Sequence, residues 1–276
     1  MKEHPAAGYG TARRWEAALV GSLLGLAALA WFATAQLSSP EMRLGLLTRE
    51  ATMSSMAPAS VSSMQGGGSQ SIPMLPLFLL TWVVMMVAMM FPAVVPVVVT
   101  FDRWVRRTQR SRLATALFAG SYLLVWSSIG LVFYAAMVYL EPLIPPGMAS
   151  VRWGAALLVV AGVYQLTPLK TKCLEQCRSP LAFVAEHATL LRRSGLGPAK
   201  VGAVHGLFCL GCCWALMLVL VLLGMMSLAW MAAVAGLIFL EKVLPGGSRV
   251  PVAVAALLIG TGGVFLVFPQ TLPAIS

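Results

Sequence analysis

The feature that most constrains this chain is a run of forty residues, from Val201 to Leu240, that contains no formally charged side chain. As one helix the run would be about 60 Å long, roughly twice the thickness of the hydrocarbon layer of a membrane. It therefore predicts two membrane-spanning helices, with a reversal near residues 224–227. Because 59% of the whole chain is hydrophobic and only 10% is charged, we expect a polytopic membrane protein.

Five further apolar windows each offer close to the 20 apolar residues that a membrane span needs. The fold class that we expect is therefore all-α, a polytopic membrane bundle of about seven transmembrane helices. The seven windows are roughly residues 16–37, 76–100, 114–140, 151–168, 201–223, 227–244 and 250–268.

These windows divide the chain into four predicted regions. Residues 1–37 hold an N-terminal cytoplasmic tail and the first span, and residues 38–75 form a flexible outward loop rich in Met, Ser and Gly. Residues 76–268 form a six-helix membrane domain, and residues 269–276 are a C-terminal tail. Methionines in the loop are able to present thioethers to Cu(I), but they repeat at no fixed spacing, so we favour a low-complexity linker.

Lysine and arginine are distributed unevenly about the spans, and such residues near helix ends stay on the cytoplasmic side. With the N-terminus inside, all of the nineteen except Arg43, Arg49 and Arg152 are cytoplasmic. An odd number of spans then places the C-terminus outside. We expect a multi-pass protein of the bacterial inner (cytoplasmic) membrane.

The net charge of +10 raises nucleic acid as a partner, but the basic residues flank the spans and form no domain interleaved with aromatic residues. Orientation and contact with anionic lipid explain them better. We therefore expect the lipid bilayer, and no nucleic acid, as a partner. The chain also contains no Walker phosphate loop and no catalytic Ser/His/Asp arrangement, which argues against transport driven by ATP and against a soluble catalytic domain.

Soft metal ligands are concentrated on the predicted fifth span. His205, Cys209 and Cys212 fall within roughly 60° of helical arc, with Cys213 and Met217 further round the same side. A thiolate inside a membrane needs a cation to offset its charge, and a bound metal supplies one. This face therefore predicts a metal site, although neutral cysteines also pack as small apolar residues.

Four methionines on the predicted second span form two pairs at helical spacing. Met85 and Met89 share one face, and Met86 and Met90 share another. Their thioethers are candidate ligands for a soft ion, whereas the alternative is that methionine fills irregular gaps in the membrane core.

Between Thr167-Pro168, a helix-start signal, and Ser179-Pro180, a stop signal, the sequence predicts a short helix at the cytoplasmic surface. Cys173 and Cys177 lie four residues apart on one face of it and are candidates for metal exchange or redox chemistry. Three basic residues lie nearby in sequence and should favour thiolate over thiol: Lys170, Lys172 and Arg178.

Glu241 and Lys242 end the predicted sixth span. Ionisable residues at the edge of a span can snorkel to the interface. If they face the bundle instead, they are candidates for a proton relay, a structural ion pair or the completion of a site. Position alone leaves these alternatives open.

Taken together, several short motifs resemble the prokaryotic family called predicted metal-binding integral membrane proteins, a domain of unknown function. The resemblance covers roughly residues 75 to 268. It implies a multi-span protein that binds metal, in some descriptions copper. It also supports Cys212 and Cys213 as metal ligands, whereas His205 and Cys209 are candidate ligands only because they share a helical face with them. The motifs are Ala88-Met89-Met90-Phe91-Pro92, Lys170 with Cys173 to Pro180, Gly211-Cys212-Cys213-Trp214 to Met217, Gly224-Met225-Met226, Trp230-Met231 and Glu241-Lys242.

We expect an integral membrane protein that handles Cu(I), by acquisition, transfer or delivery, with a metallochaperone or a membrane metalloenzyme as partner. Thiol and thioether ligands suit Cu(I), whereas zinc prefers Cys and His and is the less suitable metal. One alternative is a membrane thiol-disulfide oxidoreductase, in which the pair Cys173/Cys177 exchanges electrons with Cys209/Cys212. Another is an assembly or structural subunit of a larger membrane oxidase or oxygenase.

Overall fold

The computed structural model describes residues 6–37, 75–108, 111, 113–140, 143, 148–193, 195–223, 227–244 and 249–269. Within these ranges every regular element is helical, so the expectation of an all-α protein is confirmed. The predicted Met/Ser/Gly loop, the reversal at residues 224–226 and the tail after residue 269 lie outside the described residues.

Ten α-helices are assigned in the described part of the chain. Their order begins with α1 (Ala6–Leu37), α5 (Leu75–Arg107), α6 (Leu113–Leu140), α7 (Met148–Gln165) and α8 (Pro168–Arg178). It continues with α9 (Pro180–Glu186), α10 (Ala188–Arg193), α11 (Gly197–Leu223), α12 (Leu228–Val243) and α13 (Arg249–Val267).

Five of these helices are each long and apolar enough to cross a membrane: α1, α5, α6, α11 and α13. A sixth crossing arises if α7 and α8 are taken together, although the pair is bent by 63°. Helix α12, with 16 residues, is not among them. The uncharged run from Val201 to Leu240 is divided between α11 and α12, as its length required. The count of seven spans and the orientation remain predictions.

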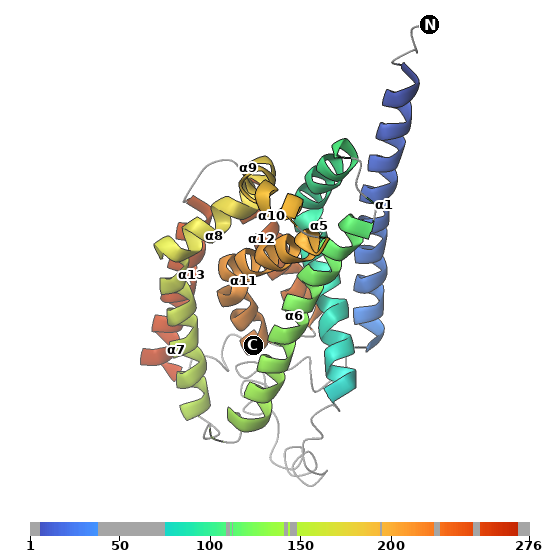
Figure 1. Ribbon diagram of the computed structural model, residues 1–276. Coiled ribbons are helices and arrows are strands. Elements are labelled where there is room, and N and C mark those ends of the chain that lie inside the picture. Colours follow the sequence, from blue (N-terminus) through green and yellow to red (C-terminus); the bar gives the residue numbers. More distant parts are fainter. Residues whose placement is uncertain are drawn as a thin grey trace, which may run out of the picture.

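The bundle is arranged around α11. Helix α1 lies beside α5 at one edge, α7 packs against α13 at the other edge, and α11 lies between them (Figure 1). Helix α11 packs most extensively against α6 and also contacts α7, α8 and α12. The short helices α8, α9 and α10 lie together at one end of the bundle (Figure 1). The buried face of α11 is therefore surrounded by several other helices.

Helix α8 begins and ends where the sequence predicts. The hydroxyl of Thr167 accepts a hydrogen bond from the backbone N–H of Lys170, and Pro168 occupies the first turn, where its missing N–H costs nothing. Ser179 ends the helix, since Pro180 follows it. Cys173 and Cys177 are both buried, so the helix turns its thiols into the bundle and not toward the surface.

Candidate metal centre

Three cysteines of α11 form a buried cluster of sulfur atoms. The Sγ atoms of Cys209, Cys212 and Cys213 all lie within 4.8 Å of one another, and no residue of the three is more than 2% exposed. Residues three and four apart on a helix are neighbours, which explains why this spacing brings the sulfurs together. Their number and separation are sufficient to hold one metal ion. We call these residues the thiol trio.

The three thiols of the trio have different hydrogen-bond partners. Cys212 Sγ and Cys213 Sγ both donate to the backbone carbonyl oxygen of Cys209, at 3.1 and 2.9 Å. Cys209 Sγ itself accepts from Lys242 Nζ at 3.1 Å and shares a hydrogen bond of 3.2 Å with the hydroxyl of Tyr122. The sulfur of Cys209 is therefore the one toward which a cation is directed.

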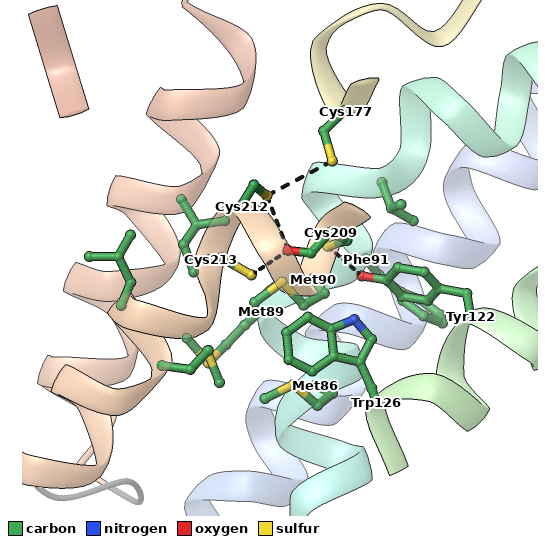
Figure 2. Close-up of a cluster of buried hydrophobic side chains, with 14 of the residues drawn as sticks. Met86, Met89, Met90, Phe91, Tyr122, Trp126, Cys177, Cys209, Cys212 and Cys213 are labelled. Carbon is green, nitrogen blue, oxygen red and sulfur yellow. Dashed lines mark hydrogen bonds between the residues drawn. The ribbon is translucent and has the colours of Figure 1, made fainter. Parts of the chain in front are cut away.

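Helix α8 brings a fourth sulfur to the trio. Cys177 Sγ lies 3.9 Å from Cys212 Sγ (Figure 2). The two helices approach this closely because Gly211 has no side chain: a Cβ atom at that position would lie 2.6 Å from Cys173 Sγ. The hydroxyl of Tyr164, on α7, also donates to the carbonyl oxygen of Gly211. The structure thus places Cys177 against the trio, with Cys173 beside Gly211.

A buried ion pair holds α8 in this position. Lys170 Nζ lies 2.9 and 2.7 Å from the two carboxylate oxygens of Glu241, and both side chains are almost fully buried. Arg178 Nε donates to the carbonyl oxygen of Glu241 at 2.7 Å. Glu241 therefore faces the bundle and forms a structural ion pair, one of the alternatives that its sequence position left open.

This arrangement corrects the expectation that Lys170, Lys172 and Arg178 favour thiolates at Cys173 and Cys177. Lys170 and Arg178 are directed to Glu241, and Lys172 is exposed. Among the contacts of the described residues, the cation that donates to a thiol is instead Lys242, on a different helix. Sequence proximity was misleading here because Lys170, although it is buried on the same face as the thiols, reaches a carboxylate of α12, and Lys172 lies on the exposed side of α8.

Methionines of α5 belong to the same buried cluster as the trio. Met86, Met89 and Met90 are drawn near the indole ring of Trp126 in the view of that cluster (Figure 2). All three are buried, as are Met85 on the same helix and Met217 on α11. The predicted thioether face of α5 therefore points into the core that contains the thiols.

His205 lies apart from the trio although it shares the same helical arc. Its ring stacks on Phe118 and Tyr122 and meets Phe183 edge-on, and its Nδ1 is buried without a hydrogen-bond partner. Its nitrogens are not part of the group of ligand atoms that the three cysteines form. A common helical face was therefore not sufficient to place His205 with the thiols.

Tyr122 is a contact of Cys209 that the sequence reasoning missed. It lies on α6, whose backbone closely approaches α11, because a Cβ atom on Gly202 would collide with the carbonyl oxygen of Phe118. A Cβ atom on Gly206 would lie 3.1 Å from Val125. The spacing of Gly202 and Gly206 is a small-residue pattern typical of close helix pairs, and it is a sequence signal from which a partner helix at this position is predictable.

Comparison with known proteins adds a family relationship to this geometry. The model of a family described as PpoB2, copper chaperone, matches residues 79–265 of the chain. The matched region includes all five cysteines, the methionines of α5, Glu241 and Lys242. No curated protein and no solved structure matches the chain.

Proposed function

The chain belongs to the PpoB2 copper chaperone family, and from this premise we propose that the thiol trio binds Cu(I) within the membrane and passes it to a client protein. The observation that carries the proposal is the cluster itself, three sulfurs within 4.8 Å of one another on one buried helix face. Thiolate ligands select soft ions, among them Cu(I), and copper is the metal in the description of the family.

The surroundings of the trio support Cu(I) over zinc. Zinc sites are built from Cys, His and carboxylate ligands, including sets of four cysteines, and make little use of thioethers. Three methionines do belong to the buried cluster that contains the trio (Figure 2). In our proposal Met86, Met89 and Met90 supply thioether contacts to the ion, with Met85 and Met217 extending the sulfur-rich lining.

Cys177 is the proposed exchange ligand, with Cys173 behind it on the same helix. A sulfur that lies 3.9 Å from Cys212 Sγ is close enough for an ion to move between the trio and α8 by replacement of one sulfur by another. We place this exchange on the cytoplasmic side of a bacterial inner membrane, since the basic residues flank the ends of α1 and α5 and surround α8. The client is a copper-requiring protein, either a metallochaperone or a membrane metalloenzyme.

The test is Cu(I) binding by the purified full-length protein in detergent, with all five thiols reduced. Competition with a chromogenic Cu(I) chelator measures the affinity, and elemental analysis measures the stoichiometry. We expect the variant Cys212→Ser/Cys213→Ser to lose binding, whereas Ala203→Ser, which also adds a hydroxyl group to α11, keeps it. Absence of Cu(I) binding by the wild-type protein, or unchanged binding by the double variant, would contradict the proposal.

A second candidate function is thiol-disulfide exchange, because the contact between Cys177 and Cys212 joins two thiols from different helices. A disulfide oxidant that takes two electrons and two protons from the two thiols would be reduced to a dithiol and would leave Cys177 and Cys212 joined by a disulfide bond. The test is mild oxidation of the metal-free protein followed by alkylation and peptide mapping. A Cys177–Cys212 disulfide that forms and is reduced in repeated cycles, in a protein that binds no Cu(I), would favour this function over the first.

A further inference from the structure

Lys242 has a partner that a buried lysine rarely has. Its ammonium group is almost fully buried at the end of α12 and donates to Cys209 Sγ at 3.1 Å. The neighbouring carboxylate, Glu241, is occupied through both of its oxygens by Lys170. Lys242 is therefore directed to sulfur and not to the acid beside it in sequence.

Among the lysines and carboxylates that are buried in the described part of the chain, one positive charge is left over. Lys170 and Glu241 cancel each other, whereas Lys242 adds a cation to an apolar setting in which an isolated charge is expensive. Tyr122 supplies a second polar contact to the same sulfur, but a neutral hydroxyl group adds no charge. The compensating negative charge has to come from the thiols.

We propose that Lys242 is the counter-charge of the metal centre and that it favours a monovalent soft ion. Cu(I) held by two or three thiolates of the trio carries a net negative charge that the ammonium of Lys242 offsets, and the ammonium repels a divalent ion in the same place more strongly than a monovalent one. A positive group beside a metal ion also repels it. With two thiolates present the complex as a whole is negative, so attraction to Lys242 exceeds that repulsion.

This inference rests on the proposed function and deepens it, because it assigns a specificity-determining role to a residue outside the ligand set. Lys242 acts through Cys209, whose sulfur it contacts, and is not itself a ligand. Groups that hydrogen-bond to metal ligands typically contribute about 10–100-fold to metal affinity. We expect a contribution of that size from Lys242, with Ag(I) as a second monovalent soft ion that depends on it in the same way.

The experiment compares wild type, Lys242→Met and Lys242→Arg as full-length proteins in detergent, by Cu(I) competition and by the ultraviolet absorption of the Cu(I)–thiolate bond. Lys242→Met should bind Cu(I) about 10–100-fold more weakly, and Lys242→Arg should recover most of the loss because it restores the charge. Lys200→Met removes an exposed lysine from the start of α11 and should bind as wild type does.

A double-mutant cycle with Cys209→Ala separates this role from a structural one. If Lys242 acts through Cys209, the effect of Lys242→Met on Cu(I) affinity should largely disappear in the Cys209→Ala background. An undiminished effect there would overturn the proposal, as would Cu(I) affinity in Lys242→Met that equals or exceeds that of wild type.

The failures are distinguishable from one another. If the wild-type protein binds no Cu(I), the proposed function fails and this inference fails with it. If wild type binds Cu(I) and Lys242→Met binds it equally well, only the inference fails. If Lys242→Met does not fold, Lys242→Gln and Lys242→Arg are compared instead, and equal Cu(I) affinities of these two variants overturn the inference.

Discussion

Lys170 and Glu241 are 71 residues apart in sequence and form an ion pair at the core of the protein, with Nζ 2.9 and 2.7 Å from the two carboxylate oxygens. The pair fastens α8 to α12. Because Cys177 lies on α8 and Lys242 follows Glu241 on α12, the same contact positions a thiol and a cation on the thiol trio.

Loss of one member of this pair should be costly. Glu241→Gln leaves the ammonium of Lys170 buried without a compensating charge, which costs about 3–5 kcal/mol. We expect the free energy of unfolding, measured in mixed micelles, to fall by that amount. The double variant Lys170→Met/Glu241→Met should recover much of it, since no buried charge is left unpaired. A Glu241→Gln protein as stable as wild type would contradict the role given to the pair.

Gly211 is required for the approach of α8 to α11. Gly211→Ala places a Cβ atom 2.6 Å from Cys173 Sγ, so either the Cys173 side chain has to rotate away or α8 has to move outward, and overpacking of this kind costs about 1–3 kcal/mol. We expect lower stability and slower formation of a Cys177–Cys212 disulfide on mild oxidation. The matched control is Gly260→Ala on α13, where nothing lies within 4 Å of the new Cβ atom. Equal disulfide formation in Gly211→Ala and wild type would contradict this view of the interface.

The hydroxyl group of Tyr122 should contribute to metal affinity through Cys209. Tyr122→Phe removes the 3.2 Å contact to Cys209 Sγ and leaves the ring in place. We expect Cu(I) affinity to fall by about tenfold, at the lower end of the range for contacts to metal ligands. Tyr139→Phe removes the hydroxyl group of an exposed tyrosine on the same helix and serves as the control. The two variants are compared by chelator competition, and equal affinities would exclude the contribution.

Replacement of the α5 methionines in the buried cluster that contains the trio tests the thioether contribution. Met→Leu conserves volume and usually costs less than about 1.5 kcal/mol of stability, so the triple variant Met86→Leu/Met89→Leu/Met90→Leu should fold. We expect weaker Cu(I) binding and unchanged Zn(II) binding, because zinc makes little use of thioethers. Met231→Leu, a buried methionine on α12, is the control. If the triple variant had wild-type Cu(I) affinity, these methionines would contribute to packing only and not to metal binding.

His205 offers a direct comparison between sequence pattern and structure. The helical spacing of the sequence predicts that His205 is a metal ligand, whereas in the structure its ring packs among Phe118, Tyr122 and Phe183. His205→Phe should therefore cost much less Cu(I) affinity than Cys212→Ser. Both variants are measured by the same competition assay, and a comparable loss in the two would restore His205 to the ligand set.

Local signals in the sequence predicted the parts of the site that depend on one helix. Thr167 and Ser179 mark the ends of α8 because capping involves neighbouring residues only. The thiol trio follows from the three- and four-residue spacing of its cysteines on α11.

The contacts between helices were not predictable in this way. The pairing of Lys170 with Glu241, and of Lys242 with Cys209, depends on where three separate helices pack. The segment after α8 forms two short helices, α9 and α10, with His187 between them. Phe183 and Leu191 are buried by tertiary contacts, which a single sequence does not specify.

Because the thiol trio is buried beneath α8, the equilibrium affinity for an ion and the rate at which the ion dissociates depend on different parts of the protein. The sulfurs of α11 set the equilibrium, since they are the ligands in our proposal. With at most 2% of each trio residue exposed, an ion escapes only during a local opening of the surrounding helices. The residence time of the ion is then governed by the loosening of α8 from α12, which gives a client protein a means to accelerate release without competing for the metal.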